Sequence, residues 1–324
     1  MTSRSRILGA AVLVALAFVL AACGSSSGDS VPTRPTGGGV SLIHYDPGNA
    51  RRPPIAIGSK NFTEEFILAD IYAQALAAAG YRVRTRLDLG AENVAYRALR
   101  RGQIDAYPEY TGTALTSFYG VNIRDVPKDA QAAYQEVRRA AAAQAVVALP
   151  PTPFTNSNGF AMTQAGAARV GARTISDLDR RAGGLTFAGP PECRAREDCL
   201  LGLEHVYGLH FQRFLVTPPE QRHQVLMSGR ADVSLVFTTD GQIKADNLVV
   251  LRDDRNLLPP YNATLLVRSD AFEAAGPDLA RVVAQVNRGL TTRVMQELNS
   301  RVDLDKEPSA QVATEYLTEA GYVR

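Results

Sequence analysis

Tryptophan is absent from the sequence, and aromatic residues make up only 7% of it. An excess of charge of one sign is lacking as well, because 35 basic and 33 acidic residues leave a formal net charge of +2. Without a basic excess, the composition gives no reason to expect a nucleic-acid partner. With 45% hydrophobic residues, however, the 324 residues are ample for two folded domains.

Common catalytic motifs are also missing. The sequence has no Gly-x-Ser-x-Gly elbow, no His-Glu-x-x-His and no glycine-rich phosphate loop of the usual form. Asp240 could act as an acid or a base, but an aspartate at a turn after a strand is more often a local hydrogen-bond acceptor. We therefore expect a binding protein and not an enzyme, with no catalytic residues and no cofactor.

Long hydrophobic runs are scarce, and only one approaches the length of a membrane span. It covers residues 7–22, follows two arginines and ends in Leu-Ala-Ala-Cys. A spanning helix needs roughly 20 apolar residues, whereas a charged start, a short apolar stretch and small residues before a cleavage point make a secretory signal. The sequence therefore predicts a signal peptide over residues 1–22.

The end of this run resembles a bacterial lipobox, in which Cys23 becomes lipid-modified and forms the new N-terminus. A plain signal peptide followed by an incidental cysteine is the alternative. Residues 23–53 are rich in Gly, Ser, Thr and Pro, which predicts a lipid anchor and a flexible tether. Together these features predict an extracytoplasmic protein anchored to the cell membrane through lipidated Cys23.

Cysteine is rare, with three residues in the chain. If Cys23 carries lipid, Cys193 and Cys199 remain, and so close a pair in an oxidising compartment usually forms a disulfide. A metal site is the alternative, because His205 and His210 lie nearby in the sequence. No second cysteine pair completes a zinc set, so we expect the disulfide and no metal.

Hydrophobic periodicity predicts two halves with the same plan. Strand, helix, strand, helix and strand follow one another from residue 54 to 110, and again from about residue 185 to 241. Both halves contain a helix-ending glycine before a strand, in "LRRGQID" and "LMSGRAD". We predict an α/β protein in which two hinge crossings join two lobes with a ligand cleft between them. The predicted bounds are 54–155 plus 239–324 for lobe I and 156–238 for lobe II.

Five stretches rich in polar or aromatic residues are expected to border this cleft. They are "GSKNFTEEF" (58–66), "YPEYTGT" (107–113), "TNSNGF" (155–160), "PPECRAR" (190–196), and "VFTTDG" (236–241) with "PPYN" (259–262). Lys60 stands just before a helix start, where it could pair with a carboxylate. Ordinary structural explanations stay open, such as Thr63 as a helix cap and Glu192 with Arg196 as a solvated pair.

The few aromatic residues gather at these strand ends. Aromatic faces attract a quaternary ammonium by about 0.5 to 2 kcal/mol each. Lys60 and Arg196 could hold the carboxylate at the other end of a small zwitterion. This pattern favours a betaine-like ligand, although composition alone would not select it.

Four segments, "GSKNFTEE", "GQIDAYPEYTGT", "LVFTTDGQI" and "LRDDRNLLPPYNATLLVR", together resemble the substrate-binding proteins of osmoprotectant ABC importers. The resemblance runs from about Ile55 to the C-terminus. It implies a type II periplasmic-binding-protein fold, and ligands such as glycine betaine, proline betaine, choline and carnitine. It also implies a box of aromatic side chains around the cationic head of the ligand.

Carried over position by position, the resemblance implies roles for individual residues. The aromatic box would use Tyr110, Phe237 and Tyr261. The carboxylate end of the ligand would contact Lys60, Thr113 and Arg196, with Glu192 nearby. A fourth aromatic is often tyrosine in the family, and here the candidates for its place are Asn158 and Phe160. Phe237 also stands where the family often has tyrosine, and these departures remove hydroxyl groups from the box.

The sequence thus predicts a solute-binding lipoprotein that closes around a quaternary-ammonium osmoprotectant and delivers it to an ABC importer. Its expected partners are the small zwitterionic or cationic solute, the permease and ATPase subunits and the membrane, and we expect a monomer. A bulkier or aromatic ligand, bound by an importer subunit or a sensor, is the alternative.

Overall fold

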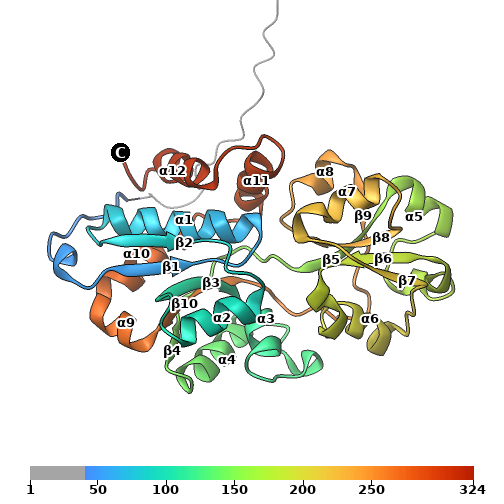
Figure 1. Cartoon of the computed structure of the whole chain (residues 1–324), viewed down its shortest axis with the longest axis horizontal. Helices are drawn as coiled ribbons and strands as arrows, with labels where there is room; N and C mark the ends of the chain where they lie inside the picture. Colours follow the sequence, from blue (N-terminus) through green and yellow to red (C-terminus); the bar gives the residue numbers. More distant parts are fainter. Residues whose placement is uncertain (1–40) are drawn as a thin grey trace, which may run out of the picture. The chain divides into compact units, whose positions relative to one another are not determined.

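The computed structural model describes residues 41–324, and the strands of this part form two five-stranded sheets (Figure 1). The predicted signal peptide, Cys23 and the start of the tether lie outside the described residues. Among residues 41–324, none of the helices combines the length and the apolar character that a membrane crossing requires. The predicted α/β architecture with two lobes is confirmed, and we call the parts around the two sheets the first and the second lobe.

The first lobe is built on a mixed sheet in which β1 pairs in parallel with β2 and β3, while β10 runs antiparallel to β3 and β4. Its strands, in sheet order, are β2 (Val83–Arg86), β1 (Ile55–Gly58), β3 (Ala106–Tyr110), β10 (Ala263–Arg268) and β4 (Val146–Ala148). Its helices are α1 (Thr63–Ala78), α2 (Glu92–Arg100), α3 (Thr111–Ser117), α4 (Ala130–Ala142), α9 (Ser269–Ala275), α10 (Pro277–Asn287), α11 (Thr292–Asp303) and α12 (Ser309–Glu319).

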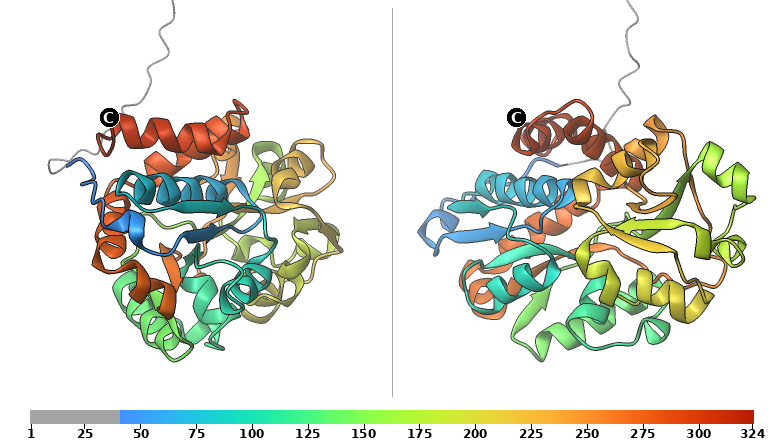
Figure 2. Two further views of the ribbon diagram at one scale, coloured as in Figure 1. Left: turned by 60° about the vertical axis from the view of Figure 1, so that its left-hand side comes forward. Right: turned by 45° about the vertical axis from the view of Figure 1, so that its right-hand side comes forward.

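Helices cover both faces of the first sheet, so its inner strands β1, β3 and β10 are buried on two sides, whereas the edge strand β2 is largely exposed. One apolar core joins the sheet to α1, α10, α11 and α12, and a separate core joins it to α2, α3 and α4. Figures 1 and 2 show α12 lying along α1 in every view. This arrangement leaves the loops at the strand ends free to form a site.

The second lobe repeats the plan. Its strands, in sheet order, are β7 (Arg213–Val216), β6 (Thr186–Gly189), β8 (Val233–Phe237), β5 (Asn158–Thr163) and β9 (Leu248–Val250). Strand β6 pairs in parallel with β7 and β8, and β5 runs antiparallel to β8 and β9. Its helices are α5 (Gln164–Val170), α6 (Leu200–Tyr207), α7 (Arg222–Met227) and α8 (Gln242–Ala245). Short 3-10 turns are η1 (Asn49–Arg51) and η2 (Ile123–Asp125) in the first lobe and η3 (Ser176–Leu178), η4 (Ala182–Gly184), η5 (Pro191–Ala195) and η6 (Pro219–Gln221) in the second.

The repeated glycine–aspartate pattern has the same geometry in both lobes. Gly102 and Gly229 each end a helix with φ of +69°, a conformation that glycine adopts at little cost. Three residues later, the carboxylate of Asp105 accepts a hydrogen bond from the amide of Ala56 at 2.8 Å. Asp232 accepts the equivalent bond from Thr186 at 3.0 Å. The aspartate thus joins the start of one strand to its neighbour in each lobe.

Two predicted boundaries differ from the structure. Strand β9 belongs to the second sheet, so the second lobe extends beyond residue 238. A three-residue apolar strand carries no signal of which sheet it joins, which explains the difference. Residues 41–53, predicted as flexible tether, instead contact the first lobe, where Ile43 is buried and its amide bonds to the carbonyl of Tyr322 at 2.9 Å.

Two extended crossings connect the lobes and pair with each other. Thr155 in the first crossing and Asn262 in the second form an isolated antiparallel bridge. The amide of Asn156 bonds to the carbonyl of Tyr261 at 2.9 Å, and the amide of Tyr261 bonds to the hydroxyl of Thr155 at 3.0 Å. The two crossings therefore form a short two-stranded ribbon beside the cleft.

Candidate ligand-binding site

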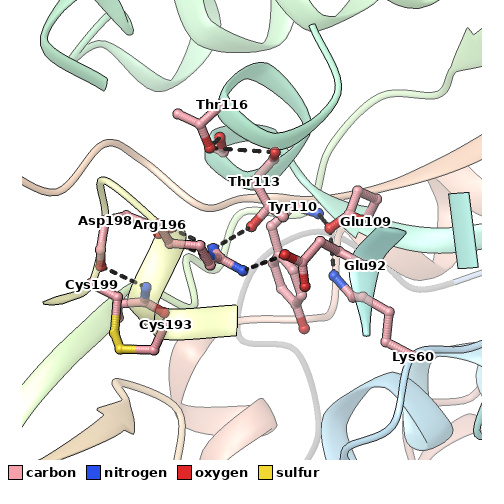
Figure 3. Close-up of polar contacts among 12 residues, drawn as sticks. Lys60, Glu92, Glu109, Tyr110, Thr113, Thr116, Cys193, Arg196, Asp198 and Cys199 are labelled. Atoms are coloured by element: carbon pink, nitrogen blue, oxygen red, sulfur yellow. Dashed lines mark hydrogen bonds and ion pairs between the residues drawn. A yellow bond between two sulfur atoms is a disulfide. The ribbon is translucent and has the colours of Figure 1, made fainter. Parts of the chain in front are cut away.

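A cavity lies between the lobes at the ends of their strands. Loops from both lobes and both crossings contribute to its wall. The lining residues include Asn61, Phe62, Glu92, Thr113, Asn156, Asn158, Glu192, Arg196, Phe237 and Tyr261, with Lys60, Leu235 and the two disulfide cysteines. Figure 3 shows how the polar residues of this wall approach one another.

Lys60 reaches the cavity from the loop between β1 and α1, and it is buried. Its ammonium pairs with the carboxylates of Glu109 and Glu65, and it lies 4.5 Å from the centre of the Tyr110 ring. Burial lowers the pKa of Lys60, but the two carboxylates outweigh burial, and the net shift is upward. Burial also raises the pKa of Glu65, to about 8, against the opposing effect of Lys60. The positive charge of Lys60 is thus already balanced by a carboxylate of the first lobe.

Helix α1 begins after this loop without the predicted threonine cap. Phe62 occupies the N-cap position, and Thr63 is the first helical residue, whose hydroxyl donates to Asp303 at 2.5 Å. The carboxylate of Glu65 instead accepts the amide of Lys60 at 3.1 Å. This turn directs the Phe62 ring into the cavity.

Glu64, in the first turn of α1, ties the first lobe to the crossings. Its carboxylate accepts hydrogen bonds from the Tyr110 hydroxyl at 2.7 Å and from the side-chain amides of Asn156 and Asn299, both at 2.8 Å. Asn299 also donates to the carbonyl of Thr239 at 3.0 Å. Burial raises the pKa of Glu64, while these hydrogen bonds oppose the shift. Glu64 therefore fixes the orientation of Asn156 at the cavity wall.

The predicted disulfide between Cys193 and Cys199 is confirmed, with 5.2 Å between the Cα atoms. It closes a short loop that carries Arg196 and Asp198 (Figure 3), and Glu192 directly precedes the loop in the sequence. Asn158 donates to the carbonyl of Asp198 at 2.9 Å and so fastens the loop to β5. The disulfide holds three ionisable side chains at the second-lobe wall of the cavity.

Arg196 reaches from this loop to the first lobe. Its Nε donates to Asp198 at 2.7 Å, and its guanidinium lies 3.3 Å from Glu92 and 3.5 Å from the Thr113 hydroxyl. Asp198 also accepts the Tyr261 hydroxyl at 2.5 Å. Burial alone would raise the pKa of Asp198, but Arg196 overrides burial and holds it below its usual value. Arg196 therefore links the two lobes through protein carboxylates.

Aromatic rings from both lobes meet in the cavity. Phe62 of the first lobe lies 5.2 Å from Phe237 of the second, between ring centres, and 6.2 Å from Tyr110. Tyr261 lines the cavity from the second crossing, whereas Tyr110 lies behind Lys60. The guanidinium of Arg222 covers the other side of Phe237 at 4.4 Å and is paired with Asp240.

The structure separates the two candidates on β5. Asn158 lines the cavity, whereas Phe160 is buried in the second-lobe core, 5.8 Å from the Phe187 ring. The two side chains share one face of the strand, but each residue adds about 3.3 Å, so Phe160 lies deeper in the lobe. Phe160 is therefore not a residue of the cavity wall.

Sequence reasoning missed Phe62, Glu92 and Asn156. The first two were within reach of the same argument that selected Lys60, because both stand where a strand gives way to a helix. Asn156 lies in the first crossing, within the segment TNSNGF, but nothing in the sequence distinguished it from its polar neighbours. Within residues 41–324, no group of His, Cys, Asp and Glu side chains could hold a metal ion. The arrangement instead suits an organic cation, with aromatic faces beside carboxylates.

Comparison with known proteins agrees with this geometry. Residues 53–319 match the family model of the substrate binding domain of ABC-type glycine betaine transport systems. The chain is 35% identical, over 84% of its length and 89% of the relative's, to a glycine-betaine-binding protein of Pseudomonas aeruginosa. It is 26% identical to an ergothioneine transport permease/ergothioneine binding protein of Helicobacter pylori, over 87% of this chain but half of that longer protein.

Among solved structures, one described as a glycine betaine/carnitine/choline ABC transporter superposes with a TM-score of 0.66. The two sequences are 23% identical, and the match covers 82% of this chain and 98% of the other. The likeness confirms the predicted type II periplasmic-binding-protein fold.

Proposed function

Because the chain belongs to the family of substrate-binding domains of ABC-type glycine betaine transport systems, we propose that it captures a quaternary-ammonium solute for an ABC importer. The solute would be of the betaine, choline or carnitine class. The predicted resemblance to osmoprotectant-binding proteins is confirmed by the family match and by the Pseudomonas relative. The family consists of binding proteins, so the expectation that the chain is not an enzyme is confirmed as well.

The aromatic contact between the lobes carries this proposal. Phe62 and Phe237 come from opposite lobes and lie 5.2 Å apart in the cavity wall, with Tyr261 also on that wall. A quaternary ammonium has no N–H and cannot donate a hydrogen bond through nitrogen, so ring faces are its natural partners. Thr113 and Asn158 line the same cavity and offer a hydroxyl and a side-chain amide to a polar group at the other end of the ligand.

Ligand-driven closure follows from the position of these groups. A solute that touches rings on both lobes binds the closed state better than the open state and shifts the population towards closure. The cross-lobe contacts of Arg196 with Glu92 and Thr113 form only when the lobes approach. The importer's permease would then recognise the closed protein, with the ATPase subunits driving uptake.

The leader sequence supports an anchored protein. In the proposal, residues 1–22 are removed and Cys23 carries the lipid that holds a monomer at the outer face of the membrane. This assignment rests on the apolar run and its Leu-Ala-Ala-Cys ending. Mass spectrometry of the membrane-extracted protein would show the mass of the acyl chains on Cys23.

Isothermal titration with glycine betaine, choline, carnitine and ergothioneine tests the proposed function. For the solute that binds, Phe62→Ala should weaken binding by roughly 1 to 3 kcal/mol through lost cation–π attraction and packing. Phe62→Leu is the matched control, because it keeps apolar volume and should recover only the packing part. Unchanged affinity in Phe62→Ala for a confirmed cationic ligand would rule out this aromatic site.

A further inference from the structure

The charges around the cavity are unevenly balanced. Two basic side chains, Lys60 and Arg196, face the four carboxylates of Glu92, Glu109, Glu192 and Asp198. Glu65, with a pKa of about 8, adds little charge at neutral pH. Arg222 adds no net charge, because Asp240 accepts two of its hydrogen bonds. A ligand entering the cavity therefore meets more negative than positive charge.

Neither basic group is free to receive a ligand carboxylate. Lys60 is enclosed by Glu65 and Glu109 in the first lobe. Arg196 uses one edge of its guanidinium for both oxygens of Asp198 and the rest for Glu92 and Thr113. A carboxylate ligand would have to displace a protein carboxylate, which would then be left buried and unpaired at a cost of several kcal/mol.

One carboxylate, in contrast, is available to a cation. Glu192 lines the cavity, and its side chain has only its own backbone amide as a hydrogen-bond partner within the described residues. Burial raises its pKa and the nearby charge of Glu92 raises it further, while its backbone hydrogen bond and the charge of Arg196 oppose the shift. Glu92 itself is buried in the first turn of α2 and faces Arg196 from the opposite lobe. A cation beside these two carboxylates would relieve their repulsion.

A hydrogen-bond acceptor lies in the same wall. Asn156 is 95% buried, as its exposure is 5%, and it lines the cavity. Its Nδ2 donates to Glu64, which determines that the other atom is the oxygen, and this Oδ1 has no hydrogen-bond partner. A buried acceptor without a donor is destabilising, so a ligand that brings a donor recovers that energy. A betaine without hydroxyl or N–H groups cannot do so.

We infer, on the basis of the proposed function, that the cavity selects a quaternary-ammonium alcohol of net positive charge, such as choline, over zwitterionic betaines. Glu192 and Glu92 serve as counter-ions for the ammonium, beside the rings of Phe62 and Phe237. Asn156 Oδ1 accepts the hydrogen bond of the ligand's hydroxyl. The preference for a cation thus arises because the protein's own carboxylates pair with Lys60 and Arg196 and leave neither of them for a ligand carboxylate.

Four small ligands separate the two features in a single titration series with the purified full chain. Choline carries net charge and a hydroxyl, tetramethylammonium carries the charge alone, carnitine carries the hydroxyl without net charge, and glycine betaine has neither. We expect choline to bind at least roughly tenfold more tightly than glycine betaine, a difference of about 1.4 kcal/mol, with the other two in between.

Glycine betaine binding as tightly as choline would overturn the inference and leave the proposed function intact. Binding of none of the four, by a protein that unfolds cooperatively, would overturn both. Tetramethylammonium equal to choline would remove the role of Asn156.

Two variants near the disulfide test the role of Glu192 as a counter-ion for the ammonium group of the ligand. Glu192→Gln keeps the shape of the side chain and should weaken choline binding roughly tenfold while changing glycine betaine little. Glu197→Gln is the matched control, because Glu197 lies within the disulfide loop but pairs with His205 outside the cavity. It should leave all four affinities unchanged. A Glu192→Gln protein with the wild-type preference for choline would refute the assignment.

Discussion

The two charged clusters at the cavity consist of the same kinds of side chain but have different roles. In each, one basic side chain lies between two carboxylates, Lys60 between Glu65 and Glu109 and Arg196 between Asp198 and Glu92. All three members of the first cluster are buried in one lobe, whereas the second cluster crosses from one lobe to the other. The first cluster therefore contributes to the stability of the fold. The second cluster is complete only when the two lobes are close together.

The same contrast appears in the ionisation of the acids. Burial dominates at Glu65 and raises its pKa to about 8, whereas Arg196 dominates at Asp198 and lowers its pKa. Lys60 is a compact cation shared by two buried acids, while the planar guanidinium meets both oxygens of Asp198. The geometry of the basic partner thus explains why the pKa is raised at Glu65 and lowered at Asp198.

Removal of the lysine should produce the largest effect. Lys60→Met leaves Glu109 and Glu65 buried without a cation and should lower the free energy of unfolding by roughly 3 to 5 kcal/mol near pH 8. Urea denaturation followed by circular dichroism measures the change. Lys244→Met, at an exposed site on α8, is the control and should stay within about 0.5 kcal/mol of wild type. A small loss for Lys60→Met would show that the first cluster is not a stabilising unit.

Opening the disulfide should produce an intermediate effect and act mainly on the second cluster. A loop of this length contributes about 2 kcal/mol by restricting the unfolded chain, so the Cys193→Ser/Cys199→Ser protein should lose about that much stability. Its ligand affinity should fall as well, because Glu192 and Arg196 lose their fixed positions. Wild type with and without reductant gives an independent comparison. Full affinity in the double variant would separate the disulfide from ligand binding.

The last effect is a change of stability with pH that distinguishes the clusters. Because the pKa of Glu65 is about 8 when folded and 4.5 when unfolded, its contribution to stability is present at low pH and is lost as the pH rises between these values. The stability of wild type relative to Glu65→Gln should therefore fall from pH 5 to pH 8.

Asp198 has the opposite sign, because its pKa is lowered on folding. Its contribution is present above pH 3.8 and is lost as the pH falls through the folded pKa, so wild type relative to Asp198→Asn should weaken only in acid. Denaturant midpoints measured for the three proteins across pH give both slopes. If the stability differences for Glu65→Gln and Asp198→Asn changed with pH in the same direction, the contrast between the two clusters would be wrong.

The fold could be predicted from the sequence more fully than the chemistry of the site. The repeat of Gly102 and Asp105 in Gly229 and Asp232 was readable, because a helix-ending glycine and a strand-joining aspartate act over a few residues. The pairing of Lys60 with Glu109 was not, since it depends on the parallel contact of β1 with β3. A basic residue predicted to hold a ligand carboxylate thus proved to be paired within the protein.

The crossings have a mechanical consequence. Because Thr155 and Asn262 pair across the two connections, the connections move as one ribbon and resist sliding past each other. Such a ribbon can twist and bend, so a rotation about its axis is the freedom that it leaves to the lobes. Few open arrangements then compete with the closed one, and the solute loses less binding energy to the ordering of its receptor.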